Sequence, residues 1–154
     1  DGFAFAAEAL VGAAFGARNR DALRRAARLT SLWGIGAVCL MSAVFLFAGN
    51  AVIAEMTTAL NVQSVAREYL PWMVLAPVVG LPCFMLDGIF IGATRTRDMR
   101  NMMLLSTAGY FAAMWALVPI FGNHGLWAAL MLFFVLRGVT LGWRYPALES
   151  AATR

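Results

Sequence analysis

Residues 72–94 read WMVLAPVVGLPCFMLDGIFIGAT, and Asp87 is the one charged side chain in this apolar run. A helix needs about 20 apolar residues to cross a bilayer core. A charge inside such a span costs roughly 2.5–3.5 kcal/mol, so it usually faces a cavity or a partner and marks an ion or substrate path. The stretch therefore predicts a membrane-spanning helix of a transporter, with Asp87 as a candidate for ion coupling.

The composition also indicates a membrane protein. Of the 154 residues, 62% are hydrophobic and 13% are charged, with a mean hydropathy of +0.74, whereas soluble domains carry about 25% charged residues. All twelve basic residues are arginine. They cluster between apolar runs, as expected for residues that set the topology of a membrane protein. The net charge of +4 is therefore explained without a nucleic-acid partner, and we expect none. Because the chain opens without methionine and directly in apolar sequence, we expect a fragment of a longer protein.

Five apolar stretches predict an all-α, polytopic transmembrane helix bundle that forms a single membrane domain. The last four are each near the length needed to span a bilayer, and the first is slightly short, as a truncated helix would be. The five predicted spans are residues 1–17, 29–54, 70–93, 102–121 and 126–143.

The arginines predict the orientation of the spans. They follow the first, third and fifth spans, whereas the other two connections hold only Arg67 and His124. By the positive-inside rule the odd-numbered spans run inward, which predicts a multi-pass membrane protein with a cytoplasmic C-terminus. Residues 18–28 could form a short helix on the inner leaflet or a solvated topology signal, and residues 55–69 suit a short interfacial helix. Residues 121–127 predict a tight turn.

Glycine pairs mark the three inward spans near their expected cytoplasmic ends. Glycines four residues apart leave one helix face without side chains, so we expect these helices to pack closely. The pairs are Gly12 with Gly16, Gly88 with Gly92, and Gly138 with Gly142. Two of the segments continue alike, as GAAFGARNRDALR and GIFIGATRTRDMR. This similarity suggests an internal repeat, although basic residues are expected after any inward span.

Two prolines predict a distortion in the third span. Proline lacks the backbone donor and clashes with the preceding turn, so Pro77 and Pro82 should bend or break the helix near its middle. Asp87 follows this region directly. Broken helices with polar groups at mid-membrane form ion sites in many transporters, although a proline kink is also a common structural feature.

Three further charged residues are candidates for ion coupling. Glu8 and Asp1 are seven residues apart and share one helix face. Counted from the end of its span, Glu8 lies ~14 Å from the inner boundary, near the midplane, whereas Asp1 could be interfacial. Arg137 lies at nearly the depth of Asp87, and it could either extend to the inner headgroups or form an ion pair with Asp87.

The sequence contains no catalytic or cofactor signature. The HExxH zinc motif, a phosphate-binding glycine loop with lysine, and the GxSxG elbow are all absent, so we expect neither an enzyme nor a metal or cofactor site. Cys39 and Cys83 lie in apolar runs and are expected to pack as small residues. Methionines spread through the spans, Met41 and Met85 among them, are either packing residues or a soft lining for varied apolar cations.

Residues 1–20, residues 86–103 and the GNHGLW turn before the last helix resemble the C-terminal lobe of a MATE (multidrug and toxic compound extrusion) transporter. The resemblance covers nearly the whole chain and would make the spans helices eight to twelve of twelve. It implies an efflux antiporter in which inward H+ or Na+ movement drives export of cationic, amphipathic compounds. The implied location is the bacterial inner membrane, and the implied partners are membrane lipid, these small molecules and an N-terminal lobe.

The resemblance also implies roles for single residues. In sodium-coupled relatives an acidic residue on the tenth helix helps to form a cation site, and Asp87 stands in the matching helix. Its partner there lies on the seventh helix, outside this chain. In the branch that this sequence most resembles, coupling is attributed largely to an aspartate on the first helix, which would make Asp87 and Glu8 auxiliary. The alternative function is a lipid-linked oligosaccharide flippase, for which we would expect more basic residues in the cavity than Arg137 alone.

Overall fold

The computed structural model describes residues 2–152 and shows five helices. They are α1 (Gly2–Gly16), α2 (Arg20–Met56), α3 (Leu60–Gly92), α4 (Thr96–Phe121) and α5 (Asn123–Ala151). No strand occurs within these described residues. The predicted all-α bundle is confirmed.

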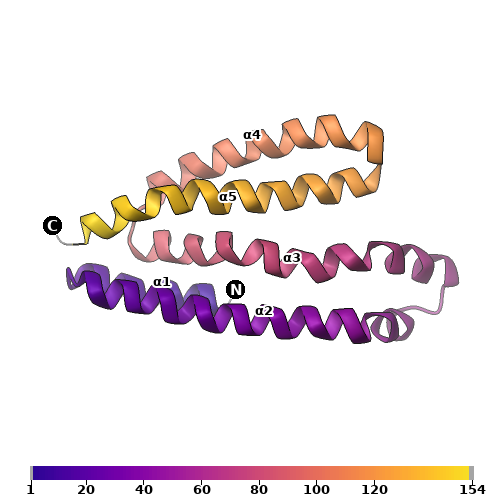
Figure 1. The fold of residues 1–154 in the computed structure, drawn as a ribbon, viewed down its shortest axis with the longest axis horizontal. Helices are drawn as coiled ribbons and strands as arrows, with labels where there is room; N and C mark the ends of the chain where they lie inside the picture. The colour runs from indigo at the N-terminus through magenta and orange to yellow at the C-terminus, as the bar shows by residue number, and fades with distance from the viewer. Residues whose placement is uncertain (1, 153–154) are drawn as a thin grey trace.

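The helices form a layered bundle with α3 at its centre (Figure 1). One side of α3 packs against α1 and α2 and the other side against α5, while α4 pairs mainly with α5. Connections alternate between two ends of the bundle. At one of these ends α1 joins α2, α3 joins α4, and α5 ends. We call it the arginine end, because most arginines lie there.

Four of the helices are long and apolar enough to cross a membrane: α2, α3, α4 and α5. The 15-residue α1 is shorter. Large apolar side chains cover the outside of the bundle, such as Phe47, 85% exposed, and Trp115, 84% exposed. Water would not solvate this surface favourably, so it must face lipid or further protein.

Two connecting segments differ from their expected form. Residues 20–28 are the first turns of the 37-residue α2, and residues 60–69 are the first turns of α3, so neither is a separate surface helix. The physical reason is that no glycine or proline interrupts either segment, which lets the helix extend past the apolar span. Asn19 starts α2, and its side chain accepts a hydrogen bond from the Ala22 amide at 2.9 Å.

The prolines do not break α3. The helix runs without interruption from Leu60 to Gly92 with Pro71, Pro77 and Pro82 inside it. A full break would expose several more backbone groups to an apolar surrounding, which costs more than the single donor that each proline removes. The expected bend at Pro77 and Pro82 stays a prediction.

The turns after α1 and α3 have the same geometry, which supports the suggested repeat. Arg18 and Thr94 occupy corresponding positions and both have positive φ, 53° and 56°, a rare conformation outside glycine. The next amide donates back to the helix in each case, from Asn19 to the Ala14 carbonyl and from Arg95 to the Phe90 carbonyl.

At the other end of the bundle, Gly122 alone separates α4 from α5, in agreement with the predicted tight turn. There His124 connects α5 to α3. The Trp72 indole donates to His124 Nδ1 at 3.0 Å, and His124 Nε2 lies 3.1 Å from Glu68 Oε1. These bonds hold α3 and α5 together at the end of the bundle opposite the arginine end.

Candidate ion-coupling site

Asp87 of α3 and Arg137 of α5 form an ion pair between two helices. Arg137 Nη2 lies 2.8 Å from Asp87 Oδ2, and the two side chains are only 10% and 13% exposed. The Arg137 guanidinium also lies over the Phe133 ring, 5.9 Å from its centroid, within cation–π range. Of the two interpretations of Arg137, the structure supports the ion pair with Asp87.

The pair leaves polar atoms without partners. Asp87 Oδ1 and Arg137 Nε are both buried and have no hydrogen-bond partner among the described residues. A buried polar atom without a partner costs about 1–3 kcal/mol, more when it is charged. Asp87 Oδ1 can therefore accept a proton or a cation while Oδ2 stays bound to Arg137.

Glu8 and Asp87 line one cavity of about 190 Å³ between α1, α3 and α4. Its other lining residues include Phe84, Ile91 and Met99. This arrangement brings together the two carboxylates that the sequence singled out. When both lining carboxyl groups are ionised they carry two negative charges, and Arg137, which pairs with Asp87 from outside the cavity lining, compensates one of them.

The position of Glu8 relative to Asp87 differs from the one that counting along the spans indicates. The Glu8 backbone packs against Gly92, the last residue of α3, so Glu8 lies nearer the arginine end than Asp87 does. That counting assumed that all inward helices end at one level. In the structure α1 continues beyond the end of α3, because Gly12 also contacts Gly92.

The close approach of α1 to α3 depends on glycine. A Cβ added at Gly88 would lie 2.3 Å from the Ala4 carbonyl oxygen, and one added at Gly92 would lie 2.3 Å from the Glu8 carbonyl oxygen. Any side chain at either position would push the helices apart. This backbone contact brings Glu8 to the cavity that it lines together with Asp87, which we call the carboxylate cavity.

The other paired glycines have looser surroundings. A Cβ at Gly138 would make ordinary contact with Pro82, 3.6 Å away, and one at Gly142 would lie 4.0 Å from Leu86. A Cβ at Gly16 would meet nothing within 4 Å. The shared sequence pattern therefore corresponds to different environments, and among the paired glycines only Gly12, Gly88 and Gly92, at the α1–α3 contact, would place a Cβ within 3.2 Å of backbone atoms.

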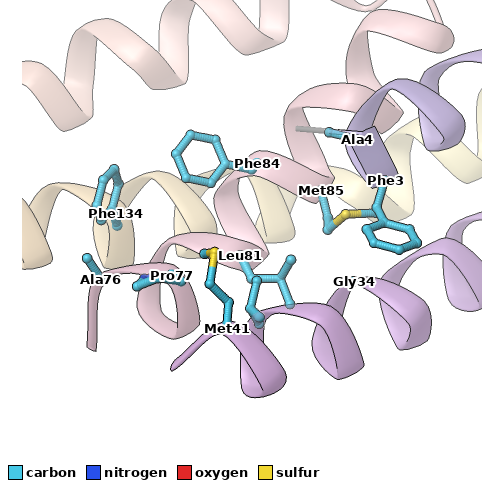
Figure 2. Close-up of a pocket in the computed structure, with 11 residues that line it drawn as sticks. Phe3, Ala4, Gly34, Met41, Ala76, Pro77, Leu81, Phe84, Met85 and Phe134 are labelled. Carbon is cyan, nitrogen blue, oxygen red and sulfur yellow. The ribbon is translucent and has the colours of Figure 1, made fainter. Parts of the chain in front are cut away.

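A second, apolar cavity adjoins the carboxylate cavity. It has a volume of about 330 Å³, and Ala4 and Phe84 line both cavities. Figure 2 shows its wall of aromatic, methionine and proline side chains from α1, α2, α3 and α5. Met41 and Met85 belong to this wall, and flexible thioethers adapt to ligands of different shape.

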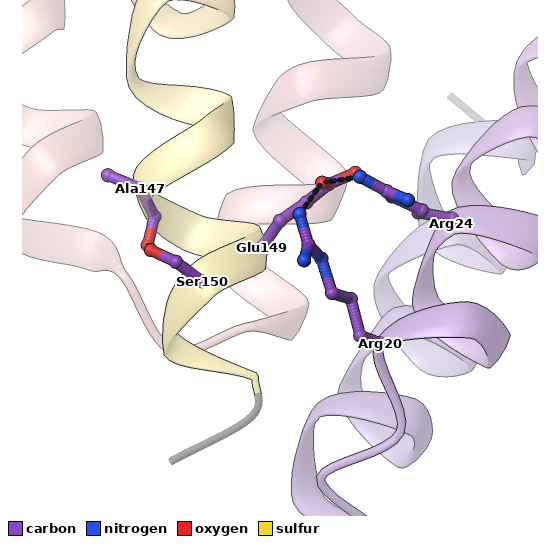
Figure 3. Close-up of polar contacts among 5 residues, drawn as sticks. All are labelled: Arg20, Arg24, Ala147, Glu149 and Ser150. Atoms are coloured by element: carbon purple, nitrogen blue, oxygen red, sulfur yellow. Dashed lines mark hydrogen bonds and ion pairs between the residues drawn. The ribbon is translucent and has the colours of Figure 1, made fainter.

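A cluster at the arginine end is not apparent from the sequence. Glu149, near the end of α5, accepts hydrogen bonds from Arg24 Nη2 at 2.8 Å and Arg20 Nη2 at 3.1 Å (Figure 3). The bonds from Arg24 and Arg20 hold the pKa of the Glu149 carboxyl below its usual value despite burial. The residues are more than 120 positions apart, so only the fold brings them together. Asp21 and Asp98 lie at the same end, so no local sequence pattern distinguishes Glu149.

Asp1 lies outside the described residues. Within residues 2–152 no cluster of three or more histidine, cysteine or acidic side chains could hold a metal ion. Cys39 is exposed and Cys83 buried, and both are free thiols.

Comparison with known proteins adds two findings. The MatE family profile matches residues 2–117. Over 150 residues the chain is 47% identical to DNA damage-inducible protein F of Escherichia coli (strain K12), an alignment that covers 94% of the chain and 32% of that relative. The chain thus spans about a third of the relative's length. No solved structure matches the chain significantly.

Proposed function

The chain belongs to the MatE family of membrane transporters, and from this premise we propose that the complete protein is a secondary active exporter of cationic or amphipathic compounds, driven by H+ or Na+. The coupling ion is the only cofactor that this function requires. The observation that carries the proposal is the buried ion pair of Asp87 and Arg137 beside a cavity that also contains Glu8.

The ion pair supports coupling because it can exist in two states. When Asp87 is ionised, Arg137 compensates its charge. When a proton or a sodium ion neutralises the carboxylate, the attraction to Arg137 weakens, and α3 and α5 lose a contact that holds them together. Ion binding can in this way alter the packing of two helices, which is what an alternating-access cycle requires.

The neighbouring apolar cavity supports the proposed substrate class. An amphipathic cation could place its apolar part among Met41, Met85 and Phe134 and its charge toward the two carboxylates. Such a compound would compete with the coupling ion for the same negative charge, which is the basis of antiport. The flippase alternative needs unpaired basic groups to hold a pyrophosphate, and Arg137 is already paired with Asp87.

We further propose a bacterial inner-membrane location with the arginine end, and so the C-terminus, in the cytoplasm. The positive-inside rule supports this orientation. The exposed apolar surface supports contacts with membrane lipid and with an N-terminal lobe, and the relative that is about three times longer leaves room for such a lobe.

The orientation can be tested by cysteine labelling in intact cells. In a background in which Cys39 and Cys83 are replaced, Arg97→Cys at the arginine end should resist a membrane-impermeant maleimide. Asn123→Cys at the opposite end is the matched control and should react. Both positions are exposed. Reaction of Arg97→Cys in unbroken cells would refute the proposed orientation.

The function can be tested with the complete protein in liposomes that contain a fluorescent lipophilic cation. An inward gradient of H+ or Na+ should accelerate release of the dye, whereas equal ion concentrations on both sides should not. A rate of dye release that is the same with and without either gradient would contradict a coupled exporter.

A further inference from the structure

A third cavity, of about 440 Å³, opens at the arginine end between α2, α3 and α5. Its α2 wall carries Arg24, Arg28 and Ser31, its α5 wall carries Tyr145, and α3 contributes Leu86 and Ile89. One part of the lining is thus basic and hydroxylic and the other is apolar. Neither the carboxylate cavity nor the proposed transport mechanism uses this site.

The polar groups suit an anionic oxygen ligand. Arg24 and Arg28 are one helical turn apart and share a face of α2, and no ion pair of Arg28 occurs among the described residues. Burial and the Glu149 carboxylate, through its charge and a hydrogen bond, raise the pKa of Tyr145 to about 12. The hydroxyl therefore keeps its proton, and a phosphate oxygen would replace Glu149 as its acceptor. Guanidinium groups match phosphate geometry particularly well.

Glu149 also lines this cavity and might be thought to repel an anion. Its two carboxylate oxygens are, however, already bound by Arg24, through Nε at 2.9 Å and Nη2 at 2.8 Å, and by Arg20 at 3.1 Å. In the lining itself the two guanidinium groups of Arg24 and Arg28 outnumber this one carboxylate. Glu149 therefore acts as a positioning residue that fixes Arg24 at the cavity.

We propose that this cavity binds the phosphate headgroup of an anionic phospholipid, with Arg28, Arg24 and Tyr145 on the phosphate and Leu86 and Ile89 beside the first acyl carbons. The place of the cavity supports a lipid, because it extends across the span ends, where headgroups meet hydrocarbon: Arg24, Arg28 and Tyr145 lie outside the predicted spans, and Leu86 and Ile89 lie inside one. Basic cavities between helices at the cytoplasmic side are suited to such headgroups. The proposal rests on the proposed orientation, which directs the arginine end to the anionic inner leaflet.

Native mass spectrometry of the complete protein can test the site with phosphatidylglycerol and phosphatidylcholine as probes. The wild type should retain phosphatidylglycerol more strongly. Arg28→Gln should weaken phosphatidylglycerol binding roughly fivefold, as expected for one basic residue near an anionic surface, and leave phosphatidylcholine unchanged. Arg97→Gln is the matched control, because it removes the same charge at the same end but does not line the cavity.

Equal binding by Arg28→Gln and the wild type, or equal losses in Arg28→Gln and Arg97→Gln, would overturn the site. Displacement of phosphatidylglycerol by excess inorganic phosphate would identify a soluble phosphate ligand and overturn the lipid assignment. Because binding is measured without transport, failure of this proposal is separate from failure of the proposed export function.

Discussion

Gly92→Leu is expected to lower the amount of folded protein in the membrane several-fold. A Cβ at this position would lie 2.3 Å from the Glu8 carbonyl oxygen, far inside any ordinary contact. The obstacle is backbone, so it cannot rotate away as a flexible side chain would. Overpacking of this kind costs about 1–3 kcal/mol or more, and 1–2 kcal/mol already changes abundance several-fold. Fluorescence-detected size-exclusion chromatography of a tagged complete protein measures the effect.

Gly16→Leu is the matched control for this variant. Gly16 belongs to the same sequence pattern and to one of the same two helices, yet an added Cβ there meets nothing within 4 Å. It should accumulate like the wild type. Equal loss in both variants would show that the pattern, and not the α1–α3 contact, controls folding.

Arg137→Leu is expected to destabilise the protein strongly, because it leaves the Asp87 carboxylate buried without its partner. Removing one member of a buried pair typically costs about 3–5 kcal/mol. The double variant Asp87→Asn/Arg137→Leu should recover most of the loss, since no uncompensated charge remains. Thermal unfolding of the detergent-solubilised complete protein, followed by tryptophan fluorescence, provides the comparison. If the double variant were no more stable than Arg137→Leu, the ion pair would not explain the effect.

The sequence predicted the fold because the apolar runs and the arginines between them are strong local signals. All five helices contain their predicted spans apart from terminal residues. The helix ends were less predictable, because a helix can extend beyond its apolar span into polar sequence. Its first and last residues are then set by local boundary residues, such as Asn19 before α2 and Gly122 before α5. The effect of Pro77 and Pro82 was also uncertain, because tertiary surroundings decide whether a proline interrupts a helix.

The candidate site was predictable in part. Isolated charges in apolar spans identified Asp87, Glu8 and Arg137, because each is too costly to leave facing lipid. Counting residues from the span ends placed Asp87 and Arg137 at one depth, and the structure pairs them. The same counting failed for Glu8, because it cannot detect that α1 extends past α3. Contacts between distant residues, such as Glu149 with Arg24, depend on helix packing and left no local pattern.

The most direct test of the central claim is gradient-driven dye release by Asp87→Asn in liposomes. Asparagine keeps the shape of aspartate and can still accept a hydrogen bond from Arg137, which reduces the cost of the uncompensated Arg137 charge, and release is compared at equal amounts of inserted protein. The asparagine side chain can no longer bind a proton or carry the charge that holds Na+. The account predicts that neither an H+ nor a Na+ gradient accelerates release by Asp87→Asn, with a smaller loss for Glu8→Gln. Full acceleration in Asp87→Asn would contradict the account and leave Asp87 a structural partner of Arg137.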